Sequence, residues 1–134
     1  MTALTSIEGI GPSYSSKLSD AGVATLEQLL ESAASKAGRG KLAQATEISE
    51  SLILNWVNRA DLARIKGVST QYADLLEAAG VDTVPELAQR NAANLHAKMA
   101  EVNEEKSLVR QLPTSTAVED WVTQAKALPR VITH

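Results

Sequence analysis

Apolar residues recur every three or four positions along most of this chain, which is the spacing of one face of an α-helix. The clearest examples form two segments: Leu52, Ile53, Trp56, Val57 and Ala60, and later Val118, Trp121, Val122 and Ala125. No alternation of apolar and polar residues is long enough to predict a β-strand. The pattern therefore predicts an all-α protein.

Capping and turn residues place the helix boundaries. A Ser or Thr with Glu or Gln three residues later forms a capping box, and the pairs are Thr5 and Glu8, Thr25 and Gln28, Thr83 and Glu86, and Thr116 and Glu119. Pro12 and Pro85 suit first turns, and Gly22 and Gly80 suit the position after a last turn. We expect helices over residues 3–8, 12–21, 25–37, 40–46, 49–59, 62–66, 70–79, 84–90, 92–102, 104–111 and 116–128.

The chain also contains an internal repeat. Residues 7–30 read IEGIGPSYSSKLSDAGVATLEQLL, and residues 65–88, 58 positions later, read IKGVSTQYADLLEAAGVDTVPELA. The two segments align without a gap. Trp56 and Trp121 match at an offset of 65, so the second copy is seven residues longer in its middle.

The repeat predicts how the chain is organised. We expect a first repeat over residues 1–61, a second over 62–128 and a tail over 129–134. The two copies are expected to bury their apolar faces against each other about a pseudo-two-fold axis. The chain has 134 residues, 44% of them hydrophobic, but only two Trp, two Tyr and no Phe. A core of Leu, Ile, Val and Ala suits packed helices better than sheets.

Composition removes several classes of function. There is no Cys, and His96 and His134 are the two histidines, so we predict no disulfide, metal site or cofactor. The N-terminal sequence does not have the pattern of a signal peptide, and no window is apolar enough for a membrane span, so we expect a cytoplasmic protein. The formal net charge of -3 argues against a strongly basic nucleic-acid binder but allows a local basic patch.

The stretch Gly9, Ile10 and Gly11 separates the first two predicted helices. Gly9 allows a tight turn, and Ile10 can anchor the turn in the core. Gly11 leaves amides uncovered at a helix N-terminus, where the partial positive charge favours a phosphate oxygen. The alternative is that the turn serves only to pack the short helix against its partner.

Eight residues around the first glycine turn form a recognisable motif: Ile7, Gly9, Ile10, Gly11, Pro12, Leu18, Ala21 and Gly22. This motif resembles that of the helix-hairpin-helix family. Over nearly its whole length the chain is similar to a family of small bacterial and archaeal proteins with two such units, known as a domain of unknown function. Matching segments include EGIGPSYSSKL, SLILNWVNRADLARIKGV, YADLLEAAGVDTVPELAQRN and NLHAKMAEVNEEKSLV. The resemblance implies two fused helix-hairpin-helix repeats. It also implies that Gly9, Ile10 and Gly11 bind a DNA or RNA backbone without reading bases, with Lys17 as the nearest supporting cation.

The second copy departs from this motif. Its turn is Gly67, Val68 and Ser69, so a serine replaces the second glycine. Gln71 and Asp74 stand where cations would help. Further acidic residues of this copy would repel phosphate, namely Glu77 and Asp82. Ser13 also stands where DNA-binding hairpins often have Lys or Arg. We therefore expect weak, salt-sensitive contact through the first turn, and leave open whether the second binds anything.

Other candidates have two interpretations each. The segment SKAGRGK contains a secondary basic patch, formed by Lys36, Arg39 and Lys41. In one interpretation the patch holds a phosphate or an acidic partner. In the other, the segment is a solvated, flexible loop. It does not match a P-loop. Trp56 and Trp121 either stack on bases or pack in the core, and core packing fits their apolar neighbours better. The matching Tyr14 and Tyr72 are expected to cover the core edge and to hydrogen-bond through their hydroxyls.

No catalytic set can be assembled from the sequence. His96 is interpreted as a surface or hydrogen-bonded residue, and Glu101, Glu104 and Glu105 as a solvated face. We therefore predict a non-enzymatic protein. The alternative to nucleic-acid binding is a protein-interaction adaptor that uses the acidic surface of the second copy or the Lys36 to Lys41 segment. The sequence does not predict an oligomeric state.

Overall fold

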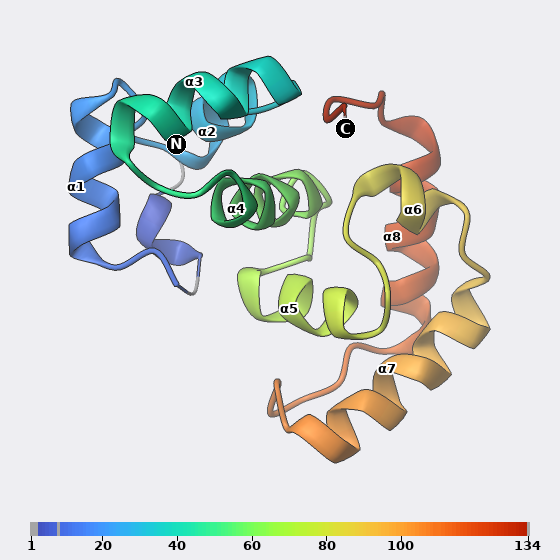
Figure 1. The fold of residues 1–134 in the computed structure, drawn as a ribbon. Coiled ribbons are helices and arrows are strands. Elements are labelled where there is room, and N and C mark those ends of the chain that lie inside the picture. The colour runs from blue at the N-terminus through green and yellow to red at the C-terminus, as the bar shows by residue number, and fades with distance from the viewer. Residues whose placement is uncertain (1–2, 8, 134) are drawn as a thin grey trace. The chain divides into compact units, whose positions relative to one another are not determined.

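The computed structural model describes residues 3–7 and 9–133, without the side chain of Thr70. Within these residues the chain forms one 3-10 helix, eight α-helices and no strand, apart from an isolated bridge between Ala3 and Thr25 (Figure 1). The elements are η1 (Leu4–Ser6), α1 (Pro12–Asp20), α2 (Leu26–Ser32), α3 (Lys36–Thr46), α4 (Glu50–Leu62), α5 (Thr70–Ala78), α6 (Val84–Ala88), α7 (Ala92–Lys106) and α8 (Ser115–Ala127). The predicted all-α class is confirmed.

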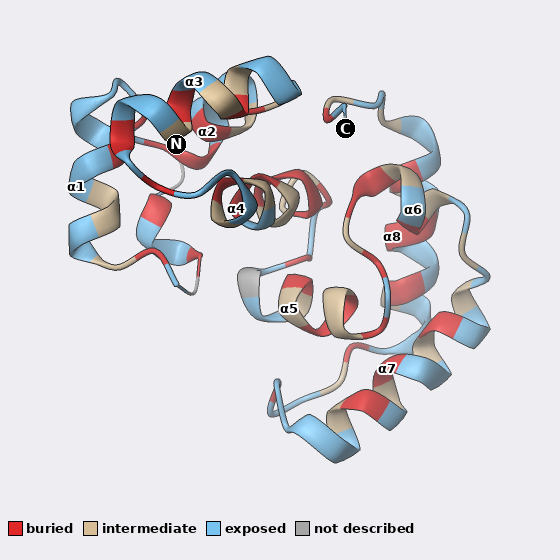
Figure 2. Ribbon diagram, viewed as in Figure 1, coloured by how far each residue is buried: buried red, intermediate tan, exposed pale blue. Residues whose placement is uncertain are grey.

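The chain divides into two compact units. The first comprises Met1–Asp61 together with Val131–His134, and the second comprises Leu62–Arg130. Each unit has its own apolar core, and α7 and α8 show a buried stripe opposite an exposed one (Figure 2). Fully buried side chains of the first core include Leu4, Ile7, Leu18, Leu29 and Ile53; those of the second include Ile65, Leu75, Leu76, Leu87, Leu95 and Met99.

A tyrosine–tryptophan pair lies in each core. The ring centroids of Tyr14 and Trp56 are 5.1 Å apart in an edge-on arrangement, and those of Tyr72 and Trp121 are 5.5 Å apart. Both indoles are buried, so the core-packing interpretation of the tryptophans agrees with the structure. The expected tyrosine hydrogen bond is present at Tyr72, whose hydroxyl donates to the carbonyl of Gln111.

The side-chain caps in the structure agree with one predicted helix start and differ from another. Thr25 caps α2, accepting from the Gln28 amide at 3.1 Å, while the Gln28 side chain accepts from the Ala24 amide at 2.7 Å. The predicted cap at Thr116 is wrong, because α8 is capped by Thr114, which accepts from the Ala117 amide. The pair Thr5 and Glu8 lies partly outside the described residues.

Three helix predictions also need correction. The glycine-rich segment expected as a loop lies in α3, because Ser35 Oγ accepts from the Gly38 amide and starts the helix there. Residues 92–106 form one helix, which ends at Ser107 in a left-handed conformation, so residues 107–111 are not helical. The helix expected over 62–66 is absent, since α4 runs to Leu62 and a turn follows.

The C-terminal segment was expected to be a tail, but its described part packs on the first unit. The Thr133 amide donates to the Ala34 carbonyl at 2.8 Å. Ile132 is 2% exposed and belongs to the first core. The chain therefore returns to its first unit after completing its second, while His134 lies outside the described residues.

Candidate functional site

The first glycine turn connects η1 to α1. Gly9 has φ +97°, a conformation that side-chain-bearing residues adopt only with strain. The Ile10 amide donates to the Ile7 carbonyl at 3.2 Å, and the Ile10 side chain is 3% exposed, in the core. The turn is therefore fixed from below by an apolar anchor, while its backbone reaches the surface.

The N-terminus of α1 follows this turn and lacks a side-chain cap. Gly11 is the N-cap residue and Pro12 has no amide hydrogen. The amides of Ser13 and Tyr14 have no hydrogen-bond acceptor among the residues the structure describes. A Cβ placed on Gly11 would meet nothing within 4 Å, so there is open space beside the N-cap residue. Two free donors at the positive end of a helix can bind an anion.

Lys17 is the basic residue of α1 and is exposed, but it lies in the last turn. It follows Ser13 by four positions, so the two share a helix face about 6 Å apart along the axis. The first turn of α1 contains no acidic residue. The structure thus brings Gly9, Ile10 and Gly11 together and leaves Lys17 one helical turn away.

The second turn has the same backbone but different partners. Gly67 has φ +95°, and the Val68 amide donates to the Ile65 carbonyl at 3.2 Å, as in the first turn. Here, however, Ser69 Oγ accepts from the Tyr72 amide at 3.3 Å. The amide and carbonyl of Lys66 are both bonded to Gln124 of α8. The Tyr72 amide is therefore bonded within the second turn, whereas the matching amide of Tyr14 in the first turn has no acceptor among the described residues.

The secondary basic patch is not formed as predicted. Lys36 and Lys41 are exposed on α3, but Arg39 is 4% exposed. Its guanidinium donates to the carbonyls of Ala33 at 2.9 Å, Ala34 at 3.1 Å and Thr133 at 2.7 Å. Arg39 therefore holds the chain's own backbone and does not present a cation to solvent.

The family assignment comes from a comparison with family models. The model for the domain of unknown function DUF4332 matches residues 8–128. The chain belongs to this family. No curated protein and no solved structure shows significant similarity to it. Since the family has no assigned activity, function has to be argued from the geometry of this chain.

Metal binding and membrane insertion find little support in the described part of the chain. It contains no group of three or more His, Cys, Asp or Glu side chains that could hold a metal ion. None of its helices has the length and apolar character needed to span a bilayer. His96 Nε2 lies 2.9 Å from the Pro113 carbonyl, which can only accept, so this nitrogen donates. His96 is thus a hydrogen-bonded structural residue of α7.

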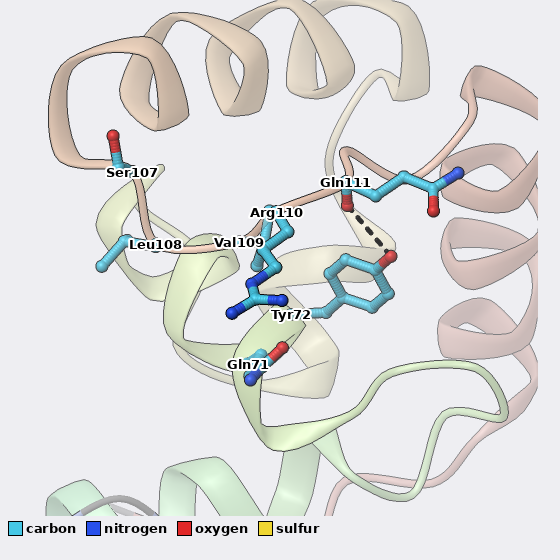
Figure 3. A pocket seen from close by; sticks show the side chains of 7 residues that line it. All are labelled: Gln71, Tyr72, Ser107, Leu108, Val109, Arg110 and Gln111. Atoms are coloured by element: carbon cyan, nitrogen blue, oxygen red, sulfur yellow. Dashed lines mark hydrogen bonds between the residues drawn. The ribbon is translucent and has the colours of Figure 1, made fainter.

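The sequence reasoning missed a pocket in the second unit. A cavity of about 510 Å³ lies between the loop Ser107–Gln111 and the first turn of α5, where Gln71 and Tyr72 line it (Figure 3). The one signal in the sequence was the extra length of the second copy. That length showed an insertion but not where it would fold.

Proposed function

We propose that this family member is a non-enzymatic module of two fused helix-hairpin-helix repeats. It binds the sugar-phosphate backbone of a nucleic acid weakly and without reading bases, through Gly9, Ile10 and Gly11. The observation that carries the proposal is the N-terminus of α1, which lacks a side-chain cap and where the amides of Ser13 and Tyr14 have no acceptor among the described residues. Such amides recognise an anion irrespective of base sequence.

The similarity of the two turns supports the helix-hairpin-helix part of the proposal. Gly9 and Gly67 have nearly the same positive φ, 97° and 95°. After each following helix, the chain closes in the same way: the Val23 amide donates to Leu18 at 2.8 Å, and the equivalent amide of Val81 donates to Leu76 at 2.8 Å. Two hairpins of one design are what a duplicated helix-hairpin-helix unit requires.

Binding is expected to be weak because few charges contribute. The net charge is -3, and Lys17 is the cation of α1. One or two phosphate contacts give a weak, salt-sensitive affinity that is measurable only at low ionic strength.

The test uses the difference between the two turns. Gly11→Ser copies the cap that Ser69 supplies in the second unit, and we expect it to weaken binding roughly fivefold or more, because it occupies a free amide. Gly11→Asp adds repulsion and should weaken binding further. The measurement is fluorescence anisotropy of a labelled oligonucleotide of about 20 nucleotides, at salt concentrations of about 20 mM and about 200 mM.

Ser69→Gly is the matched control, since it uncovers the Tyr72 amide in the second turn and leaves the first turn unchanged. It should bind at least as well as the parent protein. Absence of binding at the lower salt concentration, or equal binding by Gly11→Ser, would contradict the proposal.

The second candidate is a protein-interaction adaptor that does not bind nucleic acid. It is favoured by the acidic net charge and by Leu108, which is 37% exposed and lines the pocket of the second unit. This candidate is supported if the oligonucleotide titration is flat and light scattering shows a self-associated species, or if one defined partner co-purifies in stoichiometric amount.

A further inference from the structure

The pocket of the second unit is built on a loop that the protein holds in place. The Asn103 side chain accepts from the Val109 amide at 2.9 Å and donates to the Val109 carbonyl at 3.1 Å. The Tyr72 hydroxyl donates to the Gln111 carbonyl at 3.1 Å, and His96 donates to the Pro113 carbonyl. A loop bonded at three positions loses little conformational entropy when a ligand binds.

Three side chains that line this pocket are available to contact a ligand. Arg110 extends from the loop toward Gln71 on α5 (Figure 3), and both side chains are exposed. Neither side chain has a hydrogen bond or ion pair within the described ranges. Leu108 is the one large apolar side chain that is exposed in the described part of the chain. Arginine and tyrosine are enriched among the residues that contribute most to binding at interfaces.

The loop that lines this pocket is longer than its counterpart in the first unit. In the first unit α3 is connected to α4 by residues 47–49, whereas α7 is connected to α8 by residues 107–114. Helix α7 is also longer than α3, with 15 residues against 11. The additional residues of the second copy therefore form both the loop and the helix end that supports it.

We propose that this pocket binds a short peptide segment in which a carboxylate side chain stands next to an aliphatic one. Arg110 receives the carboxylate through its two parallel N–H groups, and the Gln71 amide adds a hydrogen bond. Leu108 and the Tyr72 ring supply the apolar contact. The volume of about 510 Å³ falls within the range of small-ligand sites and accommodates side chains of this size.

Charge and polarity favour a peptide over a nucleic acid here. The pocket lining contains a single cation, Arg110, next to an apolar side chain. A sugar-phosphate backbone would leave the exposed Leu108 side chain without an apolar partner, whereas a peptide with an aliphatic side chain would cover it. This inference does not rest on the anion-binding turn of the first unit, and either can fail without the other.

The test is a titration of isotope-labelled full-length protein followed by its amide NMR signals. N-acetyl-Leu-Glu-Leu-amide is the probe, and N-acetyl-Leu-Gln-Leu-amide is its neutral control. We expect the acidic peptide to shift the amides of residues 107–111 and Gln71 at concentrations up to about 5 mM, and the neutral peptide to bind at least fivefold more weakly.

Arg110→Gln and Leu108→Ser should each weaken the acidic peptide about fivefold or more. Lys98→Gln, which removes an exposed cation of α7 outside the pocket, should have no effect. Gly11→Ser should also leave the peptide titration unchanged, which separates this inference from the proposed function. Dispersed spectra of the variants show that the fold is intact.

Several outcomes would overturn the inference. They are the absence of shifts with the acidic peptide, equal binding of the two peptides, unchanged affinity in Arg110→Gln, or shifts confined to the first unit. A short oligothymidine that shifts the amides of residues 107–111 and displaces the peptide would assign the pocket to phosphate instead.

Discussion

Gly9 and Gly67 occupy the same position in the repeat but have different neighbours. A Cβ on Gly9 would lie 3.8 Å from Trp56 Nε1, an ordinary contact, whereas one on Gly67 would lie 3.0 Å from Trp121 Nε1. Both residues have positive φ, which imposes strain on any side chain. Both positions therefore favour glycine because of their positive φ. At Gly67 there is also less room for a Cβ than at Gly9.

At Gly67, substitution by Ala should lower the free energy of unfolding by about 2–3 kcal/mol, through backbone strain and contact with the indole of Trp121. Gly9→Ala should cost about 1–2 kcal/mol, through strain alone. Urea unfolding measures both. Gly11→Ser, at φ −85° with open space, serves as the control and should not be destabilised. Equal losses at Gly9 and Gly67 would contradict the steric argument.

At the scale of elements, α3 shows how local propensity is overridden. Two glycines favour a loop, because each costs helix stability relative to alanine. The segment is nevertheless helical, since Ser35 caps it, Leu42 is buried and Arg39 bonds to three carbonyls. Packing of one face outweighs the propensity of the exposed positions.

The two glycines of α3 should respond oppositely to alanine. At Gly40 a Cβ would meet the movable end of the Glu50 side chain at 3.1 Å, so Gly40→Ala should stabilise by roughly 0.5–1 kcal/mol. At Gly38 a Cβ would collide with the backbone carbonyl of Ser32, so Gly38→Ala should destabilise by about 1 kcal/mol or more. Thermal unfolding should show midpoint shifts of opposite sign. A stabilised Gly38→Ala variant would disprove the close approach of α2 and α3.

At the scale of the whole molecule, the first unit is assembled from both ends of the chain. Ile132 completes its core, and Arg39 bonds to the carbonyl of Thr133. Without the carbonyl of Thr133, the buried guanidinium of Arg39 would have an unsatisfied N–H donor. The first unit therefore depends on a segment that follows the second unit in sequence.

Ile132→Ala should lower the stability of the first unit by about 2–4 kcal/mol, because it leaves a cavity in a buried core. Amide hydrogen exchange can assign the effect to a unit. Protection should fall at Leu29 and Ile53 and remain at Leu75 and Met99. Val131→Ala, a truncation at a half-buried neighbour, should have a smaller effect. Equal loss of protection at all four sites would show that the two units unfold together.

The backbone geometry of the first glycine turn could be predicted because it is local. The turn at Gly9 and Gly11 depends on neighbours in sequence, and its backbone geometry follows from residue type. Arg39 could not be assigned, because its partners include a carbonyl far along the chain. The pocket around Arg110 depends on α5 and on the side chain of Asn103, whose partners are set by folding.

The sequence by itself determined the helical class, the tandem repeat and the left-handed glycines, since periodicity and glycine conformation are properties of short segments. Only the tertiary structure decided which capping residue starts α8, that α3 is helical, and that Val131 to Thr133 return to the first unit. The helicity of α3 and the return of the C-terminal segment depend on partners distant in sequence, and the free energy of those contacts exceeds the local preferences.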